Sequence, residues 1–267
     1  MPLLNLRLAR PGILIDLNRI DGMSYIRKES SQFLIGAMTR QREVEFSEPL
    51  ARELPILVEA VTQIGHPAIR NRGTIGGSLA HADPAAELPC VMAALDGEII
   101  CVGPGGERAI AASRFFTGLL STALAEDEII RELRVPLPRQ PAGWGFIEFS
   151  RRYGDFALAD VAVVLFSSDS GRRCDKARVV LGGAGTVVSS LATVEELIGE
   201  EAAPDLEDAS RMALFKEAER RAREETREIF GNDESAAYRR QLASVLTRRC
   251  VESAMDRWKV KWKTGSS

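Results

Sequence analysis

The chain has 267 residues, of which 45% are hydrophobic, so it can bury a substantial core and more than one domain. Its formal net charge is −3, and acids and bases are interspersed along the whole chain. This pattern excludes the clustered basic face of a nucleic-acid or polyanion binder. No apolar run approaches the roughly 18 residues of a membrane span, and the N-terminus lacks a signal-peptide pattern. We therefore expect a cytoplasmic protein.

Cysteine and histidine are scarce, with four and two residues in the chain. The cysteines are widely scattered and none belongs to a CxxC pair, so neither an iron–sulfur cluster nor a structural zinc is indicated. We expect reduced thiols, no metal site and no catalytic side chain in this chain. Any redox chemistry would come from a bound organic cofactor or from a partner chain.

The first half of the chain mixes predicted strands and helices. Apolar runs predict buried strands over residues 12–17 and 31–37. Thr39 is a candidate N-cap for a short helix. Apolar residues spaced by three and four predict a longer helix over residues 53–64. A buried helix over 87–95 and a strand over 97–102 follow.

Proline and glycine cluster over residues 135–143, which predicts a hinge between two parts of the chain. The part beyond the hinge is again a mixture of strands and helices, and two long helices close the chain. The predicted elements are strands over 144–152, 161–166 and 177–181, and a turn at 182–185.

The most informative segment is a glycine-containing loop over residues 74–78. Two adjacent glycines stand between the hydroxyl residues Thr74 and Ser78, so backbone N–H groups can approach an anionic ligand. Asp83 and Glu87 follow and can accept hydrogen bonds from sugar hydroxyls. The chain has neither a GxGxxG fingerprint after a strand nor a P-loop. The loop therefore indicates a phosphorylated, hydroxyl-rich ligand such as a flavin dinucleotide, the alternative being an ordinary tight turn.

With these motifs the sequence resembles the FAD-binding (medium) subunit of molybdenum hydroxylases, the family of xanthine dehydrogenase and aerobic carbon monoxide dehydrogenase. The resemblance extends over nearly the whole chain. It is carried by residues 1–11, 35–39, 65–78, 83–89, 132–136, 151–157 and 238–242.

The resemblance implies an α+β fold in two parts. Residues 1–138 would form a flavin domain like that of p-cresol methylhydroxylase, and residues 139–267 a smaller α+β domain with a three-stranded sheet and helices. It also implies a set of FAD contacts, in which Ile130 acts through its backbone and two aromatic rings shield the flavin. The implied contacts are Ile69, Thr74, Ile75, Gly76, Gly77, Ser78, Asp83, Glu87, Ile130, Tyr153 and Phe156.

Some of these side chains have alternative interpretations. Tyr153 and Phe156 could be core aromatics, because most aromatic residues serve packing. Arg70 and Arg72 could screen the FAD diphosphate or simply be surface charges.

The function implied by the resemblance is electron transfer through FAD. Electrons would arrive from the 2Fe–2S clusters of a small partner subunit and leave to an acceptor. A large partner subunit would hold the molybdenum cofactor, and the complex would be a heterohexamer, a dimer of heterotrimers. Family members carry an earlier glycine-rich loop that precedes the segment matching residues 1–11, so we expect an N-terminally incomplete flavin domain with weakened FAD affinity. The alternatives are a degenerate or structural subunit without FAD turnover and a stand-alone flavin oxidase or reductase.

Overall fold

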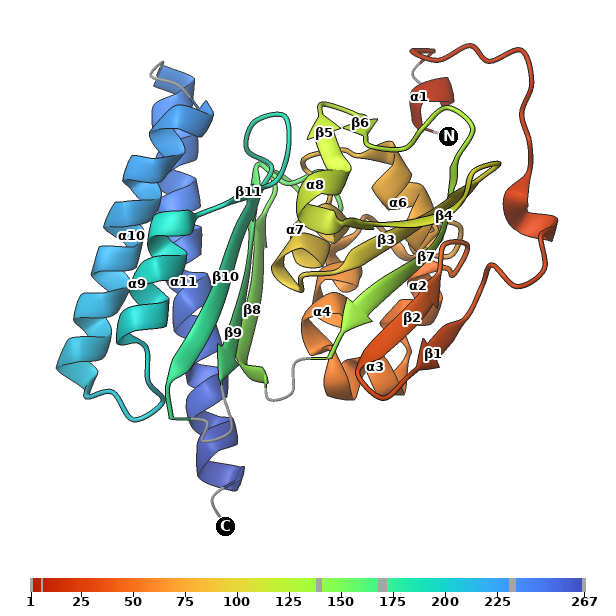
Figure 1. The fold of residues 1–267 in the computed structure, drawn as a ribbon. Coiled ribbons are helices and arrows are strands. Elements are labelled where there is room, and N and C mark those ends of the chain that lie inside the picture. The colour runs from red at the N-terminus through yellow and green to blue at the C-terminus, as the bar shows by residue number, and fades with distance from the viewer. Residues whose placement is uncertain (1, 6, 138–140, 168–171, 231–233, 266–267) are drawn as a thin grey trace.

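Two antiparallel β-sheets and two sets of helices form four alternating layers (Figure 1). From one side of the molecule to the other, these layers are long C-terminal helices, the C-terminal sheet, short helices and the N-terminal sheet. The computed structural model describes residues 2–5, 7–137, 141–167, 172–230 and 234–265. The middle of the predicted hinge, residues 138–140, therefore lies outside the described residues.

The N-terminal sheet has the strand order β1-β2-β7-β3-β4, and all its neighbours are antiparallel. The predicted strands over 31–37 and 97–102 are confirmed as its second and third strands in the chain. Its strands are β1 (Ile26–Lys28), β2 (Gln32–Gly36), β3 (Glu98–Gly103), β4 (Gly106–Ala111) and β7 (Ile129–Pro136).

Short helices follow β2, and several of them cover the inner face of this sheet. The predicted helices over 53–64 and 87–95 are confirmed, with slightly shorter bounds. Every residue of the second of these helices, α7, is buried. The helices are α2 (Gln41–Glu45), α3 (Glu48–Glu53), α4 (Pro55–Gln63), α5 (Pro67–Arg70), α6 (Ile75–His81), α7 (Glu87–Ala94) and α8 (Ala112–Phe115). Smaller elements are α1 (Pro2–Asn5), a 3-10 turn at Leu17–Arg19, β5 (Phe116–Gly118) and β6 (Ser121–Thr122).

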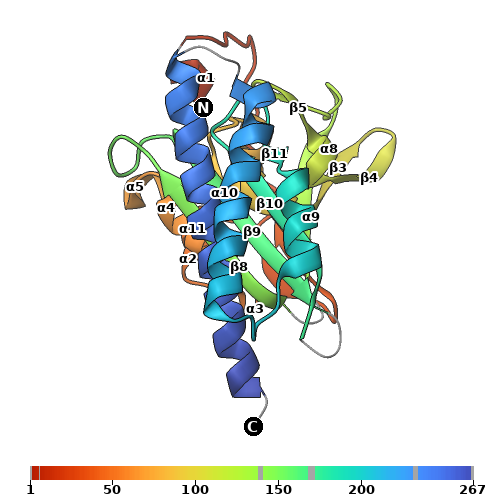
Figure 2. The same cartoon turned by 90° about the vertical axis from the view of Figure 1, so that its left-hand side faces the viewer.

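The C-terminal sheet has the order β11-β10-β9-β8, one strand more than the three expected. The extra strand is only two residues long and pairs with the end of β10, which a periodicity argument cannot detect. Three helices lie across its outer face, as Figure 2 shows. The elements are β8 (Pro141–Phe149), β9 (Ala159–Ser167), β10 (Cys174–Gly182), β11 (Ser189–Ser190), α9 (Ala192–Glu201), α10 (Asp208–Phe230) and α11 (Glu234–Gly265).

Strand β9 is buried on both faces and divides its side chains between two cores. Val161 and Val163 pack with the outer helices, whereas Ala162 and Val164 pack with α7 and the N-terminal half. This alternation follows from the two-residue period of a strand. Helix α7 thus lies between the two sheets and belongs to the core of the N-terminal half and to the inner face of the C-terminal sheet.

Two predictions in the first 40 residues are wrong. Residues 12–17 form no buried strand, and the side chains of Ile13 and Ile15 are 81% and 80% exposed, because this segment pairs with no sheet among the described residues. Thr39 does not cap a helix. Its hydroxyl instead bonds the backbone of Tyr25, and Arg40 is the N-cap of α2.

No helix in the described part of the chain is long and apolar enough to cross a membrane.

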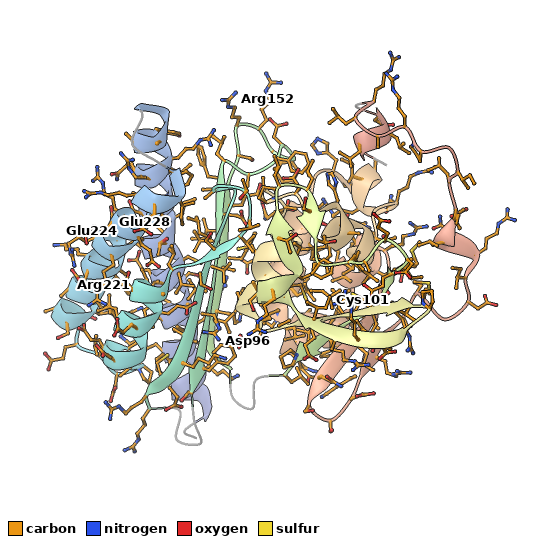
Figure 3. All side chains as sticks on the ribbon, turned by 45° about the horizontal axis from the view of Figure 1, so that its top comes forward. Asp96, Cys101, Arg152, Arg221, Glu224 and Glu228 are labelled. Atoms are coloured by element: carbon orange, nitrogen blue, oxygen red, sulfur yellow. The ribbon has the colours of Figure 1, made fainter. Side chains whose placement is uncertain are left out.

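Polar contacts join the two halves at both ends of α7. Asp96, which follows α7, binds Lys176 (Nζ–Oδ2 2.5 Å) and Arg178 (Nε–Oδ1 2.9 Å) of β10. Figure 3 labels Asp96 between the two halves. Asp96 has a positive φ of 51°, which asparagine tolerates well. The Gly183 N–H donates to the Pro84 carbonyl at 2.7 Å, a second link between the halves.

We expect Asp96→Asn to lower the free energy of unfolding by about 1–2 kcal/mol, because it removes two partly buried ion pairs without changing the backbone. The measurement is denaturant unfolding. The control is Asp175→Asn, an exposed carboxylate on β10, which should change stability by less than about 0.5 kcal/mol. Equal stability of the two variants would show that the ion pairs at Asp96 do not join the halves.

Candidate FAD site

The segment singled out in the sequence is the start of helix α6. Thr74 has extended backbone angles (φ −114°, ψ 154°), and its side-chain oxygen accepts a hydrogen bond from the Gly77 N–H at 3.1 Å. This is the geometry of an N-cap, for which threonine is a preferred residue. The two glycines therefore lie in the first turn of a helix. The expectation of a free loop at this point is wrong.

The backbone amides of this turn already have acceptors within the chain. Ile75 N–H donates to the Thr39 carbonyl at 3.0 Å and Gly76 N–H to the Ala37 carbonyl at 2.8 Å. Ser78 N–H donates to the Thr74 carbonyl at 3.1 Å. These bonds seat α6 on the end of β2. The prediction that these amides are free to bind a phosphate is therefore wrong. The groups left for a ligand are the side-chain hydroxyls and the exposed Gly77 backbone.

The residues that remain on the outside of this turn fit the diphosphate and ribityl parts of FAD. Gly77 is exposed, and an added Cβ would approach only the Thr74 side chain within 4 Å, so a ligand can lie directly against the backbone. The Thr74 hydroxyl accepts one hydrogen bond and keeps its proton for a second group. Ser78 supplies another hydroxyl one residue further on.

Two carboxyl groups predicted to bind FAD have different surroundings. The side chain of Asp83 accepts a hydrogen bond from the Ala85 N–H at 2.9 Å and so shapes the turn into α7. Glu87 opens α7 and is only 6% exposed. Burial, with the negative charge of Asp83 nearby, raises the pKa of Glu87 to about 7.

The predicted aromatic contacts are on the surface, and the alternative of core aromatics is wrong. Tyr153 and Phe156 are 63% and 61% exposed, and Ile69 on α5 is 51% exposed. The Tyr153 ring lies 5.8 Å from the His66 ring, which places the loop after β8 against α5. Ile130 differs from these three residues, because its side chain is buried in the N-terminal core and only its backbone is left for a ligand.

The two arginines before the turn have separate roles. Arg70 is 4% exposed, and its guanidinium pairs with both carboxylate oxygens of Glu45 at 2.9 and 3.1 Å. It also donates to the Ile64 carbonyl at 2.9 Å. Arg70 is therefore a structural residue, neither a surface charge nor a diphosphate contact. Arg72 is exposed.

Sequence reasoning missed two carboxyl groups behind Glu87. Glu148 on β8 and Asp160 on β9 lie opposite each other in the register of the C-terminal sheet. Asp160 is fully buried, and neither of its carboxylate oxygens has a hydrogen-bond partner among the described residues. The signal was present as single acids within apolar strands, but only the fold shows that α7 covers them.

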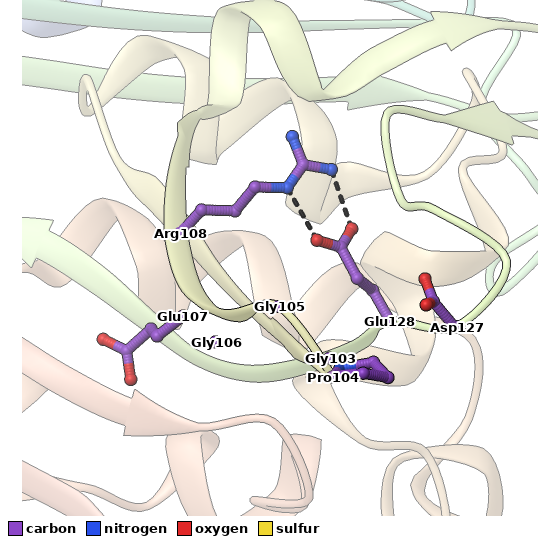
Figure 4. A pocket seen from close by; sticks show the side chains of 8 residues that line it. All are labelled: Gly103, Pro104, Gly105, Gly106, Glu107, Arg108, Asp127 and Glu128. Atoms are coloured by element: carbon purple, nitrogen blue, oxygen red, sulfur yellow. Dashed lines mark hydrogen bonds and ion pairs between the residues drawn. The ribbon is translucent and has the colours of Figure 1, made fainter.

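A cavity of about 260 Å³ opens at the β3–β4 hairpin, and none of its lining residues belongs to α6 (Figure 4). Its cation, Arg108, forms two 2.7 Å bonds with Glu128, and this pairing lowers the pKa of Glu128 to about 2. Glu128 therefore neutralises Arg108, and with Glu107 and Asp127 the lining of this cavity carries an excess of negative charge. No group of three His, Cys, Asp or Glu side chains in the described ranges could hold a metal ion.

Comparison with known proteins assigns this fold and its capped helix turn to a flavin-binding subunit. Residues 1–138 match the family model of the FAD binding domain in molybdopterin dehydrogenase, and residues 144–254 match the CO dehydrogenase flavoprotein C-terminal domain. The chain belongs to this family of FAD-binding subunits of molybdenum hydroxylases. FAD is the cofactor that the description of this family's domain names.

Relatives with different substrates in their names are similar to the chain. It is 44% identical over 189 residues to the 6-hydroxypseudooxynicotine dehydrogenase complex subunit alpha of Paenarthrobacter nicotinovorans, a match covering 70% of the chain and 64% of that relative. It is 36% identical to the caffeine dehydrogenase subunit beta of Pseudomonas sp. (strain CBB1), covering 96% and 84% of the two chains. The reconstituted CO dehydrogenase from Oligotropha carboxidovorans superimposes with a TM-score of 0.85 at 32% identity, covering 96% and 86%. These names describe subunits of larger enzymes, and they lend no support to a degenerate subunit without FAD.

Proposed function

We propose that this chain is the electron-transfer subunit of a molybdenum hydroxylase. Bound FAD would take electrons from the 2Fe–2S clusters of a small partner subunit and pass them to an acceptor. A large partner subunit would hold the molybdenum cofactor, in a dimer of heterotrimers. The observation that carries the proposal is the exposed Gly77 surface between the Thr74 and Ser78 hydroxyls. The chain itself would act as two domains, 1–138 and 139–267.

The residues have distinct proposed roles in holding the cofactor. The hydroxyls of Thr74 and Ser78 would donate to diphosphate oxygens, with the exposed Gly77 backbone forming the surface beneath. Ile75 and Gly76 are buried and would support the site by holding α6 on the end of β2. Asp83 and Glu87 would bond the ribityl chain or the ribose. Ile69 and the Ile130 backbone would border the flavin, and the exposed rings of Tyr153 and Phe156 would shield one face of it. No general acid or base is assigned to this chain, because substrate would be hydroxylated at the partner's molybdenum.

We expect Ser78→Ala to weaken FAD binding about tenfold to a hundredfold, because it removes one hydrogen bond to a charged phosphate. The measurement is the dissociation constant of FAD for the purified full chain, from quenching of flavin fluorescence. Ser47→Ala is the matched control. Ser47 also begins a helix and its side chain makes no capping bond, so FAD affinity should not change.

Unchanged FAD affinity in Ser78→Ala and in the double variant with Thr74→Val would contradict the proposed diphosphate site. The electron-transfer role has its own test. In the complex assembled with both partner subunits, addition of substrate should bleach flavin absorbance after the iron–sulfur absorbance. A flavin that stays oxidised while the clusters are reduced would refute this role.

A further inference from the structure

Three carboxyl groups meet at the buried junction between the two halves. Glu87 comes from α7, Glu148 from β8 and Asp160 from β9, and we name these three residues the acid layer. In the register of the C-terminal sheet, Asp160 lies between Glu148 on one side and Gly182 on the other. Neighbouring residues across strands point to the same face. That face is the one covered by α7, because Ala162 and Val180 of the same strands pack into the N-terminal core.

The glycine in this row leaves room for the carboxyl group of Asp160. A Cβ added to Gly182 would lie 2.3 Å from Asp160 Oδ1, so the carboxyl group rests directly on the Gly182 backbone. Asp160 is 0% exposed, and neither its two oxygens nor Glu148 Oε2 has a hydrogen-bond partner among the described residues. The Cys90 thiol, a weak donor, acts on this carboxyl group. A buried carboxylate without stronger donors is very costly, whereas a neutral carboxylic acid costs far less.

Among the residues that the structure describes, no cation acts on the acid layer. The groups acting on it are Asp83, the three carboxyls themselves and the thiol of Cys90 on α7. Cys250, from α11 on the other side of the sheet, acts on Cys90 and Asp160 only through its charge when ionised. Burial raises the pKa of Glu148 to about 8 and raises that of Asp160 strongly, and the charge of Glu87 raises both further. The titrations of the three groups are therefore coupled: the charge formed when one group ionises raises the pKa of the groups that are still protonated.

We propose that the acid layer is a set of neutral carboxylic acids in the working protein, and that Glu87 meets FAD as a hydrogen-bond donor. Glu148 and Asp160 are its positioning residues. They lie on the strand face that α7 covers and provide a neutral environment, without a cation among the described residues, for the carboxyl group of Glu87. This inference rests on the proposed FAD site, since it assigns the protonation state of one of its residues. A donor at this position bonds an acceptor oxygen of the ribityl chain or ribose. A sugar hydroxyl can also donate to an ionised Glu87, so the loss of affinity on ionisation comes from the negative charge that is added, without a cation, beside an anionic cofactor.

The first test is the infrared spectrum of the cofactor-free full chain at pH 6. We expect carboxylic-acid C=O bands from the acid layer, which lose intensity in Asp160→Asn and in Glu87→Gln. Exposed Glu98→Gln on β3 is the matched control and should leave these bands unchanged. If the spectrum has no carboxylic-acid band that is sensitive to Asp160→Asn or Glu87→Gln, the layer is ionised and the proposal is overturned.

The second test is the pH dependence of FAD binding. Because ionised Glu87 places a negative charge beside the anionic cofactor, the dissociation constant of FAD should rise by up to about tenfold for each pH unit above about 7. In Glu87→Gln, whose amide donates at every pH, the profile should be flat. Tight binding that is constant or improves from pH 6 to pH 9 in the natural chain overturns the donor role of Glu87 but leaves the proposed function intact. Absence of FAD binding at every pH overturns the proposed function, while the infrared test still decides the acid layer.

The third test is thermal unfolding against pH. A buried acid whose pKa is raised on folding stabilises the protein fully below its unfolded pKa, which is 4.5 for glutamate, and this contribution is lost as the pH rises through the folded value. The melting temperature of the natural chain should therefore fall between pH 6 and pH 9. Asp160→Asn, which is permanently neutral, should fall less steeply, whereas an unchanged slope would contradict a titrating layer.

Discussion

Replacing Arg70 with methionine should lower the free energy of unfolding by about 2–4 kcal/mol, because it breaks a buried ion pair and leaves Glu45 with the more exposed Arg42, at 3.1 Å, as its cation among the described residues. Glu45 would lose two hydrogen bonds from the guanidinium and remain in a site where its side chain is 11% exposed. The Ile64 and Gly65 carbonyls would also lose a donor. The measurement is equilibrium unfolding in urea of the full chain.

The control for this prediction is Arg72→Met, two residues further along and exposed. It should change stability by less than about 0.5 kcal/mol. The hydrogen bonds from Arg70 hold the pKa of Glu45 below its usual value, so this stabilisation is present at neutral pH and is lost as the pH falls through the lowered pKa. Similar losses in the two variants at pH 7 would show that Arg70 does not have the structural role assigned to it.

Gly76→Ala is expected to cost about 2–4 kcal/mol of stability and to abolish measurable FAD binding. An added Cβ would lie 2.5 Å from the Ala37 Cβ and 2.8 Å from the Ala37 carbonyl oxygen. Helix α6 would have to move off β2, which breaks the Gly76 N–H···O=C bond to Ala37 and adds overpacking. Because the same movement displaces Thr74 and Ser78, the proposed diphosphate contacts would be lost with it.

The matched control is Gly199→Ala in α9, where an added Cβ meets no atom within 4 Å. This substitution should stabilise the chain by up to about 1 kcal/mol, as alanine normally does in a helix. Urea unfolding and FAD titration of both variants provide the comparison. If Gly76→Ala keeps the stability of the natural chain, α6 is not held on β2 by close backbone contact.

The spacing of apolar residues was sufficient to predict the elements whose buried face can be recognised from their own sequence. Helix α4 and strand β2 were predicted because their apolar residues recur with the period of their own structure. The same reasoning failed for residues 12–17, because an apolar run does not reveal whether a partner strand is present. The prediction at Thr74 was also wrong. The double glycine was interpreted as a turn, but threonine is also a preferred first residue of a helix, where its hydroxyl accepts a hydrogen bond from the amide three residues later.

The candidate site was predictable as a sequence segment, but its chemistry depended on the fold. Nothing local to Arg70 shows that Glu45, 25 residues earlier, meets it in the interior. Likewise, Asp160 is a single acid in an apolar strand, and only the packing of α7 on that strand places it behind Glu87. Long-range neighbours decide whether a charged residue is a surface group, a structural ion pair or a buried acid.

The burial of α7 on all sides has a consequence for how this subunit can be divided or recombined. The helix is contributed by the N-terminal half, yet its residues share a core with Phe146, Ala162 and Val164 of the C-terminal sheet. In a hybrid that joins the halves of two relatives in the region of residues 138–144, α7 would come from one parent and would pack on a sheet that comes from the other. Recombination therefore preserves the interior only when α7 and the inner face of β8, β9 and β10 are inherited together.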